Sequence, residues 1–165
     1  MNVRLRRALS AGLCAAPLAC GILLPDSRTP LDRAREVAPR CARQADAADA
    51  GLLSPSLVES VEPAYSVVAS GNDRLVHLRG ARLRLRPLPG VSVEAIQRAL
   101  ECHQVRVTMG TEGELPSDPY VLPGAWLDVT VESVGDGFLA AVRADGFDRA
   151  QSVLDRARGF VASRR

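Results

Sequence analysis

The sequence contains no lysine, so all 21 of its basic residues are arginine. This absence excludes every mechanism that needs a lysine amine, including Schiff-base chemistry, phosphate-loop binding and general-base catalysis by lysine. Histidine is scarce, since His77 and His103 are the only two, and aromatic residues make up 4% of the chain. The cysteine spacing matches neither the CxxC motif of thioredoxin-like proteins nor a zinc ribbon, which excludes both classes.

Two short segments resemble known signatures but lack the context that those signatures need. Residues 135–140 (GDGFLA) match the GxGxxA pattern of dinucleotide-binding proteins, but a strand pattern follows where the fingerprint requires a helix. Residues 90–94 (GVSVE) lack the final glycine of a nucleophile elbow, and Ser92 is better placed to cap a helix. We therefore expect a protein that is not an enzyme.

The first 21 residues have the pattern of an export signal. Three arginines precede an apolar stretch of twelve residues, 8–19, which suits a signal peptide and is too short to span a bilayer. Residues 17–20 (PLAC) partly match the Leu-small-small-Cys pattern of bacterial lipoproteins, so Cys20 is either lipidated or follows ordinary cleavage unmodified. We expect an exported protein in the periplasm or anchored to the membrane by lipid.

The positive charge of the full chain belongs to this leader. Without residues 1–19 the chain keeps 18 arginines against 19 acidic residues, a net charge of −1. A nearly neutral mature protein gives no electrostatic reason to expect a nucleic-acid partner. The expected partners are an envelope protein or another envelope component, and the membrane itself if Cys20 carries lipid.

The pairing of the remaining cysteines depends on the same processing step. Cys14 leaves with the signal. If Cys20 is lipidated, Cys41 and Cys102 remain, and an oxidising periplasm favours a disulfide between them. If Cys20 is unmodified, three thiols remain and the pairing stays open.

The rest of the chain divides into a linker and a domain. Residues 22–63 are typical of a linker that is partly helical, with a helix start at Thr29-Pro30 and with Pro39 to limit or kink that helix. Residues 64–165 predict an α+β domain in the order strand, strand, helix, strand, strand, helix. We expect a two-layer sandwich with a four-stranded, mostly antiparallel sheet and two helices on one face.

Three local features of this domain are specific enough to check. Gly80 lies inside a predicted long strand, residues 75–86, where the apolar phase changes, and therefore predicts a β-bulge. Ser92 is the predicted cap of the first domain helix. Asp145 is the predicted cap of the last helix, whose apolar face includes Phe147.

His77, Cys102 and His103 are the candidate metal ligands, because histidine and cysteine side chains bind copper or zinc. This interpretation requires a strand and a helix to bring the three together. The alternative is a histidine at the edge of the core, hydrogen-bonded to backbone, beside a cysteine that is buried or disulfide-bonded.

A strip of arginines along the long strand is the candidate anion site. Guanidinium groups at this spacing suit phosphate, lipid headgroups or an acidic polymer, whereas the alternative is a solvated strand face. The strip consists of Arg79, Arg82, Arg84 and Arg86, joined by Arg74.

The loop at residues 118–126 is the candidate binding loop, because long irregular loops with aromatic residues are often functional. Its aromatic residues are Tyr120 and Trp126. The alternative is that these two side chains cover one end of the core.

Three segments together resemble uncharacterised exported proteins and predicted lipoproteins of GC-rich bacteria. They are residues 101–103 (ECH), 118–124 (DPYVLPG) and 131–138 (VESVGDGF), and the resemblance covers residues 75–160. It implies export and adds no mechanism. The leading hypothesis is thus a non-enzymatic binding module of the cell envelope, and the alternative is a small periplasmic copper- or zinc-binding protein.

Overall fold

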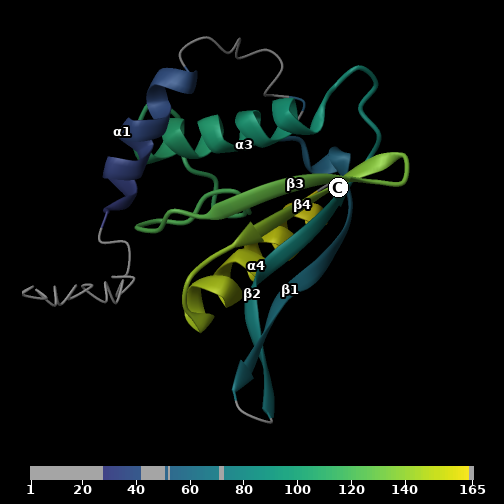
Figure 1. The fold of residues 1–165 in the computed structure, drawn as a ribbon. Helices are drawn as coiled ribbons and strands as arrows, with labels where there is room; N and C mark the ends of the chain where they lie inside the picture. Colours follow the sequence, from purple (N-terminus) through teal and green to yellow (C-terminus); the bar gives the residue numbers. More distant parts are fainter. Residues whose placement is uncertain (1–27, 42–50, 52, 71–72, 164–165) are drawn as a thin grey trace, which may run out of the picture.

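The computed structural model describes residues 28–41, 51, 53–70 and 73–163. Its elements are α1 (Pro30–Cys41), the short 3-10 helix η1 (Pro55–Leu57), β1 (Val58–Ser70), β2 (Asp73–Leu85), α3 (Val93–Thr108), β3 (Asp128–Val134), β4 (Gly137–Arg143) and α4 (Phe147–Ala162). The predicted α+β class and the repeated strand-strand-helix order are confirmed (Figure 1).

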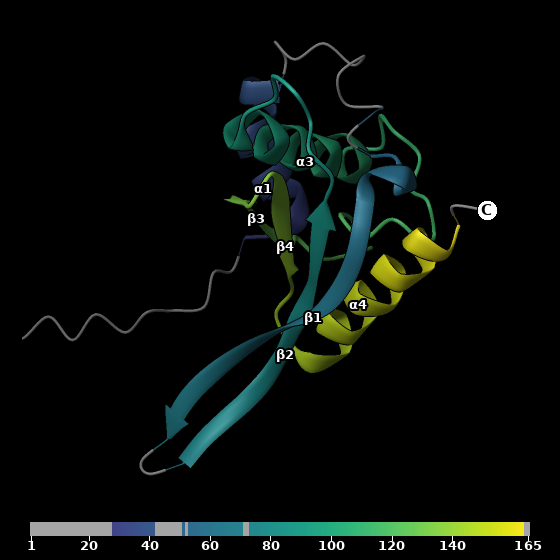
Figure 2. The same cartoon turned by 90° about the vertical axis from the view of Figure 1, so that its right-hand side faces the viewer.

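The four strands form one antiparallel sheet in the order β1-β2-β4-β3. On its inner face, Leu83 of β2 faces Ala140 of β4, which in turn faces Val131 of β3. Helices α3 and α4 pack on this face and complete one hydrophobic core. Their buried apolar residues include Ile96, Ala99, Leu100, Val153, Leu154, Ala157 and Phe160. The sheet with two helices on one face is the predicted arrangement (Figure 2).

The two domain helices begin in different ways. The hydroxyl of Ser92 accepts a hydrogen bond from the backbone N–H of Ala95 at 3.2 Å, as predicted for a cap. Helix α4 has Gly146 at its N-cap, with φ of 84° and no side-chain cap. The prediction that Asp145 caps α4 is wrong, because its carboxylate pairs with Arg79 of β2 at 2.8 Å.

A β-bulge divides the β1–β2 hairpin into two halves. Ala64 pairs with Gly80, but the next residue, Tyr65, pairs with Leu78. Arg79 is therefore the extra residue of β2 at the bulge. Gly80 has a φ of 142°, and a Cβ atom there would lie 2.1 Å from a carbonyl oxygen of β4. Only glycine fits that position, so the predicted bulge is confirmed.

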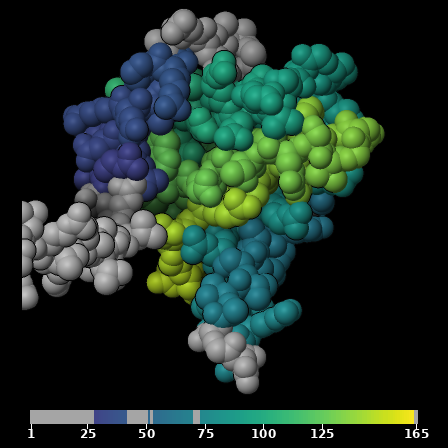
Figure 3. All heavy atoms as spheres, in the orientation of Figure 1, coloured from purple at the N-terminus to yellow at the C-terminus, as the bar shows by residue number. Residues whose placement is uncertain are grey.

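Beyond this bulge the hairpin leaves the sheet. Strand β4 pairs with β2 only between Gly80 and Leu85, so the outer part of β2 pairs with β1 alone. We call this two-stranded part, residues 65–70 and 73–78, the ribbon arm. Figures 1 and 2 show it projecting from the body of the protein, and Figure 3 shows its atoms extending beyond the helices.

Strand β1 begins at Val58, before the predicted domain boundary at residue 64. Glu59, Glu62 and Pro63 give this segment the composition of a linker. Glutamate and proline are both tolerated in a strand at the edge of a sheet, where charge and proline limit pairing with other chains.

Helix α1 ties part of the predicted linker to the domain. It continues through Pro39 to Cys41, so the proline costs a hydrogen bond near the helix end without stopping the helix earlier. A disulfide joins Cys41 to Cys102 of α3, with an S–S distance of 2.08 Å and a Cα–Cα distance of 5.4 Å. This is the pair that the sequence favours if Cys20 is lipidated.

The predicted export signal, residues 1–21, lies outside the described residues. Within the part of the chain that the structure describes, the helices are too short or too polar to cross a lipid bilayer.

Candidate functional site

The three predicted metal ligands do not share a site. His77 is exposed on the ribbon arm, whereas Cys102 is buried in the disulfide and His103 is buried in α3. A cysteine in a disulfide has no thiolate to offer a metal. Among the described residues, no group of three or more histidine, cysteine, aspartate and glutamate side chains is placed to hold a metal ion. The geometry therefore corrects the hypothesis that these three residues form one site.

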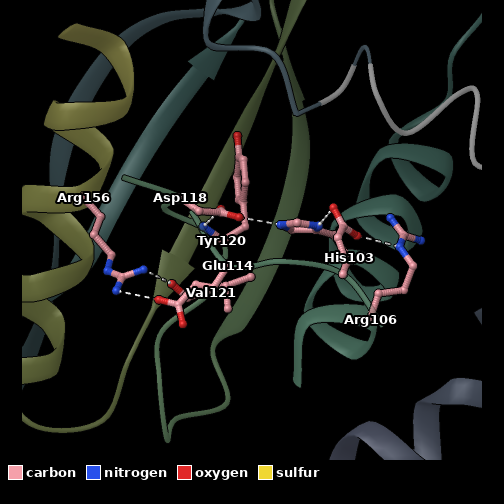
Figure 4. Close-up of polar contacts among 8 residues, drawn as sticks. His103, Arg106, Glu114, Asp118, Tyr120, Val121 and Arg156 are labelled. Atoms are coloured by element: carbon pink, nitrogen blue, oxygen red, sulfur yellow. Dashed lines mark hydrogen bonds and ion pairs between the residues drawn. The ribbon is translucent and has the colours of Figure 1, made fainter. Parts of the chain in front are cut away.

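His103 lies instead in a charged cluster between α3 and the α3–β3 loop (Figure 4). Its Nε2 lies 2.5 Å from Oδ2 of Asp118 and its Nδ1 lies 3.1 Å from Oε1 of Glu112. The contact with Glu112 is an ion pair without the alignment of a hydrogen bond. Arg106 donates to the other oxygen of Glu112 at 2.8 Å. The expected backbone partner of His103 is thus wrong, because two carboxylates take that place.

The cluster shifts two pKa values in opposite directions. Burial lowers the pKa of His103, but the hydrogen bond and charge of Asp118, with the charge of Glu112, outweigh burial and raise the pKa above 6.5. Burial raises the pKa of Glu112, but the hydrogen bond from Arg106 and the charge of His103 lower it below 4.5. Both shifts favour the charged forms, so the cluster is held together by charge.

The His103–Asp118 pair of this cluster is closed to solvent, so we interpret it as a structural contact. His103 is 3% exposed and Asp118 is 4% exposed, which leaves no space for a substrate against either side chain. From the other side, Arg156 of α4 donates to the carbonyl of Val121 at 3.1 Å and pairs with Glu114 at 2.8 Å (Figure 4). The α3–β3 loop is thus clamped between two helices.

The two aromatic residues of the predicted binding loop have different environments. Tyr120 is fully buried, and its ring packs edge-on against Phe160 with 6.2 Å between the ring centroids. Its hydroxyl points away from the charged cluster and has no protein hydrogen-bond partner (Figure 4). Tyr120 therefore covers the core, which is the alternative interpretation. Trp126 is half-buried beside a hollow of about 260 Å³ that three arginines also line.

The arginine strip is partly neutralised by acidic residues. Arg79 and Arg84 pair with carboxylates of neighbouring segments at 2.8 Å and 3.3 Å. Arg74, Arg82 and Arg86 are exposed. Because two guanidinium groups already contact acids, the strip has the character of a solvated strand face over most of its length. Arg79 differs from the others because it also borders a cleft.

That cleft opens between the ribbon arm and the first turns of α4 and has a volume of about 690 Å³. Tyr65, Val76 and Phe147 line it and are 61, 62 and 66% exposed, respectively. Leu78 and Leu154 give it a less exposed apolar floor. A hollow of this size that combines apolar and polar lining groups is typical of a ligand site. We call it the hairpin cleft.

The lining of the hairpin cleft contains basic residue types and, among the described residues, no acidic ones. The basic residues are His77, Arg79 and Arg158. The acidic partners of the two arginines, Asp145 at 2.8 Å and Asp155 at 3.8 Å, lie outside the lining. The cleft thus combines an apolar surface with a basic rim.

No protein-family model matches the chain, and no curated protein or solved structure matches it either. The resemblance to exported proteins of GC-rich bacteria stays a prediction.

The hairpin cleft contains residues that the sequence did not mark as functional. Phe147 was expected on the buried face of the last helix, but the first turn of α4 lies beside the ribbon arm and leaves its ring exposed. Two residues assigned to other hypotheses, His77 and Arg79, meet at this cleft. The sequence feature that could have indicated this cleft is the presence of apolar residues on both strands of the predicted hairpin.

Proposed function

We propose that this protein is an exported binding module that holds an anionic amphipathic ligand, such as an acyl chain with a carboxylate or phosphate head, in the hairpin cleft. The observation that carries the proposal is the combination of exposed apolar side chains with a lining that has basic and no acidic residues. An apolar surface alone would suit many ligands, and the basic rim selects for negative charge.

The apolar part of the ligand would cover Tyr65, Val76 and Phe147. Each of these side chains has about two thirds of its surface in water, and burial of apolar surface is favourable in proportion to its area. The buried Leu154 behind them supplies a fixed floor, so the site needs no large rearrangement to receive an acyl chain.

The head group would lie near Arg79 and Arg158. A guanidinium has five N–H donors, so Arg79 can keep its contact with Asp145 and still bind an anion. Arg158 is freer, since its contact with Asp155 spans 3.8 Å and both side chains are about 60% exposed. His77 adds a third basic group at the same rim when it is protonated.

The proposed cellular location is argued from the leader, residues 1–20. The basic start, the apolar stretch and Cys20 support export to the cell envelope, where amphiphiles with acidic heads are components of membranes. Mass spectrometry of the mature N-terminus tests this part. A start at or next to Cys20 supports export, and a mass increase at Cys20 equal to a lipid group identifies the anchored form. A chain that keeps residues 1–19 in the native host contradicts export.

Isothermal titration calorimetry with decanoate tests the binding proposal, and decyltrimethylammonium serves as the ligand of equal length and opposite charge. We expect decanoate to bind saturably in a 1:1 ratio and more tightly than the cation. Phe147→Ser should weaken decanoate binding by about tenfold because it removes apolar contact area. Arg158→Gln should weaken it by about fivefold, the size expected for an exposed ion pair.

The matched control is Arg98→Gln, an exposed arginine on α3 away from the hairpin cleft. This variant should bind decanoate like the native protein. Equal binding of the two ligands, or a Phe147→Ser variant that binds as the native protein does, contradicts the proposal.

A further inference from the structure

The outer half of β1 is an exposed and uncharged edge. Strand β1 is the outermost strand of the sheet, and its residues from Ala64 to Ser70 include no charged side chain. Tyr65, Val67 and Val68 are 49–61% exposed. Aromatic and β-branched residues favour strand pairing, and an exposed apolar edge is a template for another strand.

The features that normally protect such an edge occur only in the inner half of β1. Glu59, Glu62 and Pro63 lie there, and charge and proline both oppose pairing with a second chain. The part of β1 that belongs to the ribbon arm therefore lacks the residues that oppose pairing with a second chain. The arm is also a two-stranded ribbon, which is marginally stable in water without a further strand or a packing partner.

The opposite edge of the arm, formed by β2, has a different character. Asp73, Arg74 and Arg79 lie along it, and charged side chains on an edge oppose pairing with another strand. The edge of β1 has no such charge to oppose a second copy. The charge pattern thus directs self-association to β1.

We propose that the protein forms a homodimer in which the outer halves of two β1 strands pair antiparallel about a two-fold axis near Val67. A two-fold contact requires a self-complementary surface. If residue i of the first copy meets residue j of the second, then residue j of the first copy also meets residue i of the second. A register centred on Val67 places Tyr65 opposite Ala69 of the second copy. Glu59 and Glu62 lie outside the paired segment, so the acids of the two copies do not oppose each other.

The exposed part of β1 offers a small interface. Its exposed apolar side chains and its unpaired backbone edge together cover less than the ~800 Å² per partner of a standard interface. The exposed apolar residues of β1 are Tyr65, Val67 and Val68. An interface of this size predicts a dimer that dissociates on dilution.

Sedimentation velocity of the purified protein across concentrations from about 1 to 200 μM tests the proposal, because a weak interface dissociates in this range. We expect a monomer at the lowest concentrations and a rising dimer fraction at the highest. Val67→Arg should abolish the dimer, because it places two guanidinium groups opposite each other at the axis. The control is Val76→Arg on β2, which changes a residue that faces Val67 and is equally exposed. It should keep the dimer.

A second measurement does not depend on disrupting the interface. The Val67→Cys variant should form a disulfide-linked dimer under mild oxidation, whereas Val76→Cys should cross-link several times more slowly. A protein that stays monomeric at every concentration overturns the proposal. It is also overturned if the two arginine variants weaken the dimer equally, or if the two cysteine variants cross-link equally.

Discussion

Replacement of His103 by alanine removes the imidazole that lies 2.5 Å from Asp118. The Asp118 carboxylate is 4% exposed, so the variant leaves a buried charge whose remaining hydrogen bond comes from the backbone N–H of Tyr120 at 2.9 Å. Removing one partner of a buried ion pair costs about 3–5 kcal/mol. Because small domains have free energies of unfolding of about 5–15 kcal/mol, the variant should fold with a much lower urea midpoint.

The pH dependence of stability should report the same cluster. The pKa of His103 is raised in the folded protein above its ordinary value of 6.5, so its stabilising effect is fully present below about pH 6.5. This effect is lost as the pH rises through the folded pKa. Glu112 acts at the other end, because its lowered pKa gives stability above about pH 4.5 that is lost in more acidic solution. The native free energy of unfolding should therefore fall above neutral pH.

Urea unfolding followed by the fluorescence of Trp126 at several pH values measures both effects. His77→Ala is the matched control, since His77 is the other histidine of the chain and is exposed. It should change the free energy of unfolding by less than about 0.5 kcal/mol and keep the decline above neutral pH. The reasoning is refuted if His103→Ala lowers the free energy of unfolding no more than His77→Ala does. It is also refuted if the stability of the His103→Ala variant declines above neutral pH as that of the native protein does.

Three further changes in stability follow, each measured by urea unfolding. Gly80→Ala should lower the free energy of unfolding by more than about 2 kcal/mol, because a Cβ would lie 2.1 Å from a backbone oxygen. The control Gly90→Ala should lower it by about 1 kcal/mol, because Gly90 has a positive φ but open space around it. Equal losses in the two variants would contradict this prediction. Cys41→Ser should cost up to about 4 kcal/mol, since its disulfide closes a sequence separation of 61 residues, and native protein in reductant should match the variant. Tyr120→Phe should raise stability by about 1 kcal/mol by removing a buried hydroxyl without a protein partner, and a loss would show that the hydroxyl is hydrogen-bonded.

The fold could be predicted because its signals are local. Alternation in the strands and the helical spacing of apolar residues indicate each element over a short window. The bulge at Gly80 is an example, since the change in apolar phase across one strand requires an extra residue at a position that tolerates positive φ. The cap at Ser92 depends on a contact three residues away and was also within reach.

The candidate site could not be predicted because it depends on contacts between distant segments. The helical spacing of His103 indicates that it faces the core, but Asp118 lies 15 residues later in an irregular loop. Phe147 follows the apolar period of α4, yet its exposure depends on where β4 ends relative to the longer β2. Periodicity predicts which face of an element is apolar and leaves open how far a neighbouring element covers that face.

Binding of an anionic amphiphile in the hairpin cleft is tested most directly by an NMR titration of ¹⁵N-labelled protein with decanoate. The predicted result is a saturable set of amide shifts concentrated on Val76, Leu78 and Phe147, with the indole signal of Trp126 unmoved. The contradicting result is the absence of saturable shifts at these three residues, or larger shifts at the hollow beside Trp126.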